Sequence, residues 1–389
     1  MLLLIALANA PWYLWAADGQ GLVSAHPADA SGIDAAVQAV SITAIDWRTY
    51  PMFAFLFGYG IWQLYSRQMA AGVSRREARR VLRRRHWWML AFGGVHAALL
   101  WGGDIVGAYG LAGLVLTWLF LDRKDTTLKV WAIVLGSFLV IGAILPATGA
   151  ARFDGAEGAD VVSGPDVSIQ QIDYLQSILP RIEVWSVATP AQALLGLTVP
   201  VAILLAMLAA RHRVLENPRE HLMLLRVAAV IGLVLGWGIG ALIAASHLGL
   251  LGTSDAGVSF LEAQSVSGLL CGIGYVAVFG LIAARIERRG SQGRIAYALQ
   301  AVGKRSLSSY LAQSVIMAPV LSAWGLGVGA ALTTWSMALF AIVTWAVTVV
   351  LAVALERRGR MGPAEWLLRR LAYPAVSRKE RVVGQEASA

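Results

Sequence analysis

The chain has 389 residues, of which 58% are hydrophobic and 14% charged, and its mean hydropathy is +0.64. This composition is typical of polytopic membrane proteins and excludes an ordinary soluble domain. The net charge of +9 would suit nucleic acid, but the basic residues lie between apolar runs, where they report membrane topology. We therefore expect no nucleic-acid partner.

Apolar runs long enough for membrane-crossing helices follow one another along the whole chain. They lie at 1–16, 50–66, 87–102, 104–121, 128–147, 188–210, 227–246, 264–284, 306–323 and 331–355. Between them, strongly basic segments alternate with segments that hold only Arg48, Arg152 and Arg181 as basic residues. By the positive-inside rule, this alternation predicts an all-α bundle of about ten transmembrane helices with both termini in the cytoplasm.

The apolar runs fall into two groups separated by a long polar segment. We expect N-terminal membrane helices at 1–146 with a basic cytoplasmic loop at 67–86, an extracytoplasmic loop at 147–187, C-terminal membrane helices at 188–374 and a flexible cytoplasmic tail at 375–389. The first run lacks the basic start of a signal peptide, so we interpret it as a first span clipped at its cytoplasmic end.

The loop at 147–187 becomes amphipathic toward its end. Ile169, Ile172, Leu175 and Ile178 recur at helical spacing, which predicts a helix lying on the membrane surface. A lid over an extracytoplasmic cavity is the alternative.

The basic loop carries arginines on one broad side of a predicted helix. They are Arg75, Arg76, Arg79, Arg80 and Arg83. Such a face suits anionic lipid headgroups, and it would equally hold the phosphates of a donor such as acyl-CoA, because arginine pairs bidentately with phosphate. No nucleotide-binding glycine loop follows a strand pattern, so nucleotide hydrolysis has no support.

Two ionisable residues interrupt the stretch GGVHAALLWGGDIVGAYGL. On one continuous helix, His96 and Asp104 would lie about 12 Å apart along the axis, too far for a direct bond. Gly102 and Gly103 offer a turn that would bring the aspartate back toward the bundle. Ionisable groups in membrane spans usually mark a site, so we predict His96 and Asp104 as the catalytic pair, with Tyr109 as a nearby binding residue. A histidine bonded between helices and an aspartate capping a turn are the structural alternatives.

Other polar residues extend the candidate site. Asp46 and Arg48 precede the second span, where an anionic ligand or a carboxylate such as Asp46 or Asp104 would hold the arginine. Ser306, Tyr310 and Gln313 form a polar stripe on the ninth span, which either lines a wet cavity or bonds other helices.

Several kinds of chemistry lack a motif. His247, Glu262 and Gln264 are weaker polar candidates, and Cys271 lies in an apolar run, where we expect a buried, inert thiol. No metal-ligand spacing occurs, so we expect no metal and no permanently bound cofactor.

Four stretches in order resemble a known family. PMFAFLFGYG, the following GGVHAALLWGGDIVGAYGL, AVGKRSLSSYLAQSV and GPAEWLLRRLAYP are similar to the YeiB-like bacterial membrane proteins, whose C-terminal half is the domain of unknown function 418. The resemblance covers nearly the whole chain. It implies a multi-pass protein of the bacterial cytoplasmic (inner) membrane.

The family is distantly similar to the transmembrane acyltransferases, which include heparan glucosaminide acetyltransferases. That likeness implies acyl transfer from a cytoplasmic thioester donor, such as acyl-CoA, to an outer-side acceptor, with an essential histidine. We favour His96 over His26 as that histidine. We expect membrane lipids and a small-molecule or lipid-linked acceptor as partners. A transporter of a small polar or amphipathic solute is the alternative, and a homodimer is an open alternative to a monomer.

Overall fold

The computed structural model describes residues 1–17, 21–23, 25–145, 165–251, 263–289 and 293–373. Helices make up the regular structure, and these ranges contain no β-strand. The all-α prediction is therefore confirmed. Glu262 and much of the loop at 147–187 lie outside the described residues.

Each of the ten predicted spans coincides with helical structure. The corresponding elements are α1 (Leu2–Asn9) with η1 (Ala10–Tyr13), α3 (Thr49–Ala70), α4 (Arg75–Leu99), α5 (Val106–Phe120), α6 (Asp125–Ile144), α8 (Ile178–Pro190) with η4 (Ala191–Leu195) and α9 (Thr198–Arg211), α10 (Leu222–His247), α12 (Gln264–Arg289), α14 (Ser306–Leu321) and α15 (Thr334–Arg357). Shorter helices are α2 (Gly32–Ala44), α7 (Pro165–Gln170), α13 (Arg294–Lys304) and α16 (Pro363–Ala372).

Part of this bundle meets the length and apolarity that a membrane crossing requires. Among the described residues, four helices do so, namely α6, α10, α12 and α15, and a bent pair formed by Ile178–Leu195 and Thr198–Arg211 raises the number to five. Large apolar side chains are exposed on these helices, including Ile133 at 68%, Val234 at 65% and Val350 at 67%. Such apolar exposure fits contact with lipid rather than water. The chain is thus a helical membrane protein, and a total of ten spans stays a prediction.

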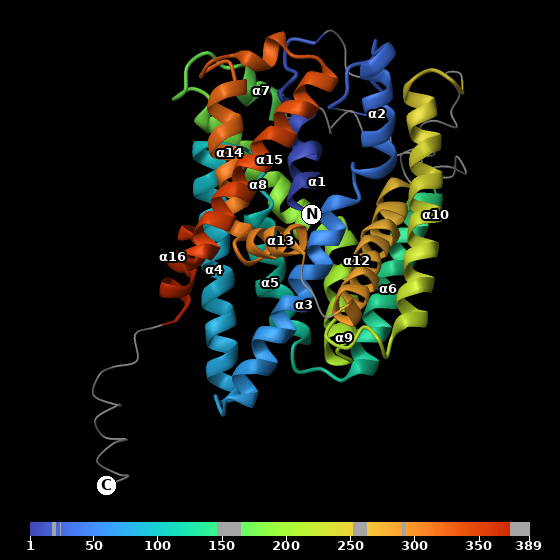
Figure 1. The fold of residues 1–389 in the computed structure, drawn as a ribbon, viewed down its shortest axis with the longest axis vertical. Helices are drawn as coiled ribbons and strands as arrows, with labels where there is room; N and C mark the ends of the chain where they lie inside the picture. The colour runs from blue at the N-terminus through green and yellow to red at the C-terminus, as the bar shows by residue number, and fades with distance from the viewer. Residues whose placement is uncertain (18–20, 24, 146–164, 252–262, 290–292, 374–389) are drawn as a thin grey trace.

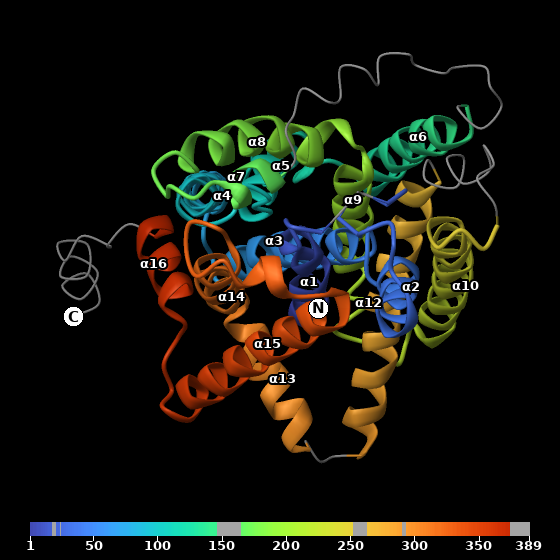
Figure 2. The ribbon, with the colours of Figure 1, turned by 90° about the horizontal axis from the view of Figure 1, so that it is seen from above.

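The helices run mainly along one direction, so the bundle has two distinct ends (Figure 1). The turn between α3 and α4 lies at the lower end, which we call the basic end because the arginines of residues 75–85 are found there. The helices α2 and α7 lie at the opposite end. Viewed from above, α1 sits among α3, α14 and α15 (Figure 2), with which it is in contact.

Glycines allow α10 and α12 to pack at short range. A Cβ atom on Gly232 would lie 2.4 Å from the carbonyl oxygen of Leu270, and one on Gly236 would lie 2.3 Å from the Cβ of Cys271. Small residues at such contacts are the usual means by which membrane helices approach each other. Cys271 is a free, buried thiol in this contact, as expected.

The predicted surface helix over 169–178 is wrong as a continuous element. The chain leaves helix α7 after Gln170 and begins α8 at Ile178. Ile169 is buried while Ile172 and Leu175 are exposed, so these residues do not form one apolar stripe.

Candidate functional site

His96 and Asp104 come together where α4 ends and α5 begins, at the opposite end of the bundle from the arginines. The Nδ1 atom of His96 lies 2.8 Å from Oδ1 of Asp104, and both residues are 4% exposed. Residues 102–103 form a turn between the helices, as the Gly-Gly pair predicts. The backbone N–H of Gly107 donates to Oδ2 of Asp104 at 2.6 Å, so the aspartate also caps the start of α5.

This pairing leaves one ring nitrogen of His96 available. Because the Asp104 carboxylate accepts from Nδ1, we assign the proton of the neutral ring to that atom, and Nε2 becomes an acceptor. Nε2 is buried and has no hydrogen-bond partner among the described residues. An imidazole fixed in this way can take a proton from a hydroxyl or an amine.

Tyr310 from α14 lies beside the pair. Its ring centroid is 5.2 Å from that of His96, and its hydroxyl oxygen accepts from the backbone N–H of Ile105 at 3.5 Å. A small cavity of about 10 Å³ adjoins Tyr310, enough for about one water molecule. Its walls are Ala6, Asn9, Tyr13, Trp101, Tyr310, Gln313, Ser314 and Met317.

Close approach of α4 and α5 depends on glycines that the sequence reasoning did not single out. A Cβ atom on Gly93 would lie 2.3 Å from the nitrogen of Gly107 and 2.4 Å from Oδ2 of Asp104. These distances are too short for non-bonded atoms, so residue 93 must be glycine for Asp104 to reach His96 in this geometry. The only sequence signal is the small-residue pair 93–94 just before His96.

Arg181 was also missed, although it is one of few basic residues expected on the outer side. It is 1% exposed, and its Nη1 donates to the carbonyl oxygens of Leu99 and Leu100 at 3.2 and 3.5 Å. Its guanidinium also lies over the rings of Tyr174 and Trp324. A cation at the C-terminus of α4 offsets the partial negative charge of these carbonyls.

The other predicted binding residues divide between the site and the scaffold. Gln313 lines the small cavity with Tyr310 and donates to the carbonyl oxygen of Leu2 at 3.4 Å. Tyr109 instead donates to the carbonyl oxygen of Tyr50 at 2.8 Å and stacks on Phe53. Ser306 is the first residue of α14 and does not line the cavity.

Asp46 and Arg48 belong to a different cluster. Asp46 accepts from Nε2 of His26 at 2.8 Å and from Oγ of Ser41 at 3.2 Å. Arg48 is fully buried and donates to the backbone carbonyl oxygens of Asp46 and, at 3.0 Å, of Gly236. The expectation that a carboxylate such as Asp46 or Asp104 holds Arg48 directly is wrong, because within the described residues its guanidinium donates to backbone carbonyls and forms no ion pair.

This cluster contains a second buried histidine–aspartate pair. His26, the alternative histidine of the sequence analysis, is 2% exposed, and His247 lies edge-on at 5.9 Å between ring centroids. His247 in turn interacts with Oε1 of Gln38 at 3.1 Å and accepts from the backbone N–H of Val23 at 3.2 Å. Of the weaker candidates, His247 therefore joins this cluster, while Gln264 is simply buried at the start of α12.

The stretches 301–315 and 362–374 cap each other's helices. The backbone N–H groups of Leu307 and Ser308 donate to Oε1 of Glu365 at 2.8 and 3.0 Å, and Oγ of Ser308 accepts from the N–H of Ala364 at 3.0 Å. Arg305 donates to Oε2 of Glu356 at 2.6 Å and to the carbonyl oxygen of Arg360. These residues hold α14, α15 and α16 together, which is a structural role.

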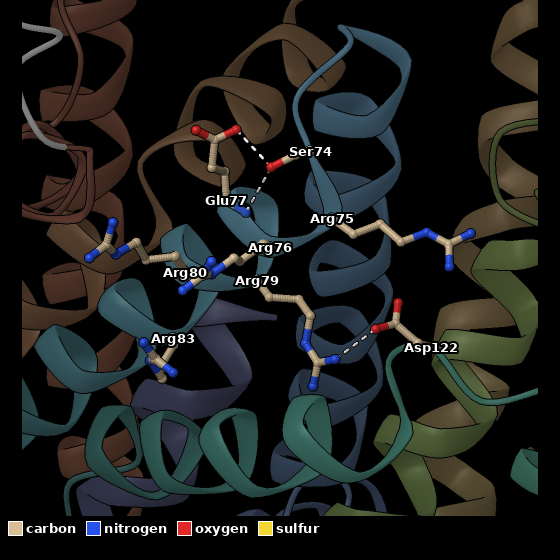
Figure 3. Close-up of a pocket in the computed structure, with 8 residues that line it drawn as sticks. All are labelled: Ser74, Arg75, Arg76, Glu77, Arg79, Arg80, Arg83 and Asp122. Atoms are coloured by element: carbon tan, nitrogen blue, oxygen red, sulfur yellow. Dashed lines mark hydrogen bonds and ion pairs between the residues drawn. The ribbon is translucent and has the colours of Figure 1, made fainter.

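At the basic end, the five predicted arginines line one open hollow of about 940 Å³ (Figure 3). Ser74 caps α4 by accepting from the N–H of Glu77 at 3.3 Å, which fixes where the arginine-bearing turns begin. Arg79 forms an ion pair with Asp122 at 2.8 Å. Within the described residues, the other four arginines, Arg75, Arg76, Arg80 and Arg83, form no ion pair with a carboxylate.

A second, mainly apolar hollow of about 260 Å³ adjoins the first and shares Arg79 and Arg83 with it. It lies between α4 and α5, the two helices that carry His96 and Asp104 at their far ends. From Arg80 to His96, α4 spans about 24 Å.

Groups of three or more histidine, cysteine, aspartate or glutamate residues that could hold a metal ion are absent from the described ranges. The residues gathered around His96 are suited to proton transfer and hydrogen bonding.

Comparisons with known proteins agree with the resemblance noted from the motifs. Residues 209–375 match the family described as "Protein of unknown function (DUF418)". The chain is 28% identical over 353 residues to "Uncharacterized protein YxaH" of Bacillus subtilis (strain 168), covering 85% of this chain and 81% of that protein. It is 25% identical over 349 residues to "Uncharacterized protein YeiB" of Escherichia coli (strain K12), covering 85% and 84%. No solved structure matches.

Proposed function

We propose that this chain, a YeiB-like membrane protein of the DUF418 family, passes an acyl group from a cytoplasmic thioester donor to an acceptor on the outer side. The observation that carries the proposal is the buried His96–Asp104 pair. Its ring nitrogen Nε2 has no partner among the described residues, and the ring lies beside Tyr310, which forms part of the wall of a small cavity. A histidine oriented by a carboxylate is the arrangement that acyl-transfer chemistry requires of a general base.

In this proposal, Nε2 of His96 removes the proton from a hydroxyl or amine of the acceptor as that atom attacks the thioester carbonyl. Asp104 holds the ring in the required tautomer and stabilises the imidazolium that forms. When the tetrahedral intermediate collapses, the carbon–sulfur bond breaks and the imidazolium returns the proton to the thiolate. The result is an acylated acceptor and a free thiol.

Tyr310 and Gln313 are the residues that we propose to contact the reacting groups. The Tyr310 oxygen accepts from the Ile105 N–H, which leaves its own proton free to donate to the oxyanion that develops at the carbonyl. Gln313 lines the same cavity and would orient the acceptor.

The arginine hollow supports acyl-CoA as the donor. Four of its guanidinium groups lack a carboxylate partner in the part of the chain that the structure describes, and phosphate oxygens would supply their missing acceptors. The adjoining apolar hollow is lined by residues between Arg79 and Arg83 on α4 and between Leu114 and Leu121 at the end of α5, and it suits the beginning of the less polar arm of the donor. Anionic lipid headgroups offer the same chemistry, and competition between the two is part of the test below.

The proposal includes ten membrane crossings, both termini in the cytoplasm and location in the bacterial cytoplasmic membrane. In that orientation the arginines face the cytoplasm, where thioester donors are found, and His96 lies nearer the outer side.

Transport of a small polar or amphipathic solute is the second candidate, and one observation favours it. The helices Ile178–Leu195 and Thr198–Arg211 meet at an angle of 47°. The five residues Ala191–Leu195 before the bend are π-helical, and Leu197 has a left-handed backbone with φ of 58°. Broken helices of this kind are common in transporters.

The test is to identify a product. The full chain is reconstituted in nanodiscs and incubated with acetyl-CoA labelled in the acyl group, together with a lipid extract and, separately, soluble hydroxyl or amine acceptors. Acyl transfer predicts the release of free thiol and the appearance of label in a new compound. Added anionic lipid should compete with acetyl-CoA for the arginine hollow and so raise the concentration of acetyl-CoA that is needed. Transport would be favoured instead if the protein neither binds nor consumes the thioester under any of these conditions and if proteoliposomes that contain it take up a small polar or amphipathic solute.

A further inference from the structure

A cavity of about 350 Å³ lies between α1, α2 and α15, away from the pair formed by His96 and Asp104. Its volume falls within the range of about 300–1,000 Å³ that small-molecule sites have. Apolar side chains make up most of its walls. The lining residues are Leu7, Ala10, Pro11, Leu14, His26, Ala36, Val37, Val40, Ser41, Ile45, Thr334, Met337, Ala338 and Ile342.

We propose that this cavity binds one single-chain amphiphile from the membrane, with its aliphatic chain in the cavity and a neutral hydroxyl group hydrogen-bonded to His26. The proposal is independent of acyl transfer at His96. Its ligand class is a long-chain or prenyl alcohol, or a lipid with one such chain and hydroxyl.

His26 supplies the polar recognition. Its Nε2 is 2.8 Å from Oδ2 of Asp46, whose other oxygen accepts from Ser41 at 3.2 Å. A carboxylate that accepts from both partners places the proton of the neutral ring on Nε2, so Nδ1 is an acceptor. Nδ1 is buried without a hydrogen-bond partner in the described part of the chain, and a buried polar atom of this kind is costly unless a ligand or water satisfies it. An acceptor calls for a donor, and a hydroxyl group provides one.

The charge of the lining favours a neutral head. Among the described residues, its polar lining consists of His26, Ser41 and Thr334, without a lysine or an arginine. Asp46 directly behind His26 would repel a carboxylate or a phosphate. The nearby Arg48 does not line the cavity, and its two terminal nitrogens donate to backbone carbonyls.

The cavity reaches the apolar surface of the bundle. Val40 and Ile342 line it and are 62% and 42% exposed, and α15 is one of the helices suited to cross a membrane. An entrance bordered by exposed aliphatic side chains on such a helix faces lipid tails, which supply the chain of the occupant.

One helical segment separates this cavity from the small cavity beside Tyr310. Ala6, Asn9 and Tyr13 face the small cavity, whereas Leu7, Ala10 and Leu14 face the larger one. The spacing of each set places it on its own side of α1 and η1. A variant that fills one cavity therefore leaves the lining of the other in place.

Photolabelling tests the proposal. The full chain in nanodiscs is treated with hexadecanol that carries a diazirine in its tail, and labelled peptides are mapped by mass spectrometry. We expect label in α2 and α15 that excess hexadecanol displaces and that palmitate and hexadecyl phosphate displace about tenfold less effectively, as the loss of one buried hydrogen bond predicts.

Two variants on α15 provide a matched pair. Ala338→Phe fills the cavity and should abolish the displaceable label, whereas Ala346→Phe, at an exposed position that does not line the cavity, should leave it unchanged. His26→Ala should remove the preference for the alcohol, with folding checked by gel filtration. Equal displacement by all three head groups, or label that persists in Ala338→Phe, would overturn the proposal.

Discussion

Nδ1 of His96 lies 2.8 Å from Oδ1 of Asp104, across the turn that ends α4 and starts α5. The aspartate is held from its other side by the N–H of Gly107. Both oxygens are thus committed, so the imidazole is fixed in one orientation and one tautomer. This relationship turns a buried histidine, which would otherwise be only a packing residue, into a group able to accept a proton.

Replacement of Asp104 by asparagine should lower acyl transfer by about 10²-fold or more, because the neutral amide neither fixes the tautomer nor stabilises an imidazolium. The rate of thiol release from acetyl-CoA measures this effect. Asp173→Asn is the control, since Asp173 is exposed and its role is to close a turn near the same end. An Asp104→Asn protein with wild-type turnover would remove Asp104 from the site.

Gly93→Ala should destabilise the protein by about 1–3 kcal/mol and reduce activity, because the added methyl group overlaps the start of α5 and the Asp104 carboxylate. Thermal unfolding in a fixed detergent measures the first effect. Gly136→Ala on α6 is the control, because its Cβ meets nothing within 4 Å and alanine favours the helix. Equal melting temperatures for both variants would show that α4 and α5 do not need this close contact.

The double change Arg76→Gln and Arg80→Gln should raise the KM for acetyl-CoA about tenfold or more while leaving kcat near the wild-type value, since the hollow is proposed to bind phosphate and not to react. The dependence of KM on ionic strength should weaken as well. Arg219→Gln, an exposed arginine outside the hollow, is the matched control. If both proteins show the same KM as the wild type, the donor does not bind at these arginines.

Glu365→Ala should lower the free energy of unfolding by about 1–3 kcal/mol, because two backbone N–H groups at the start of α14 lose their acceptor. Glu287→Ala, which removes an exposed ion pair with Arg219, should change it by less than about 1 kcal/mol. Denaturant titration in detergent compares the two. A selective loss of kcat in Glu365→Ala without loss of stability would contradict the capping role.

The helices were largely predictable from the sequence, because apolar runs and basic segments are local features. Each predicted span has a helical counterpart. The break between α7 and α8 was not predictable from the spacing of Ile169 and Ile178, because periodicity alone does not reveal where a chain turns.

The site was predictable only in part. His96 and Asp104 were predictable because a glycine pair between two ionisable residues indicates a turn. The contact of this pair with Tyr310 was not predictable, because Tyr310 lies 205 residues after Ile105 in the chain. Tyr109 and Arg48 donate to the backbone carbonyl oxygens of Tyr50 and Gly236, which lie on other helices and carry no sequence signature. The pair of His26 and Asp46 was not predicted, because helix α2 and its flanking loops separate the two residues in the chain.

The rate of thiol release from acetyl-CoA by His96→Gln, compared with the wild type in identical nanodiscs and with gel filtration as the folding check, tests the central claim most directly. Loss of the general base predicts a rate lower by about 10²–10⁴-fold with donor binding retained at the arginine hollow. A His96→Gln protein that releases thiol at the wild-type rate would contradict it.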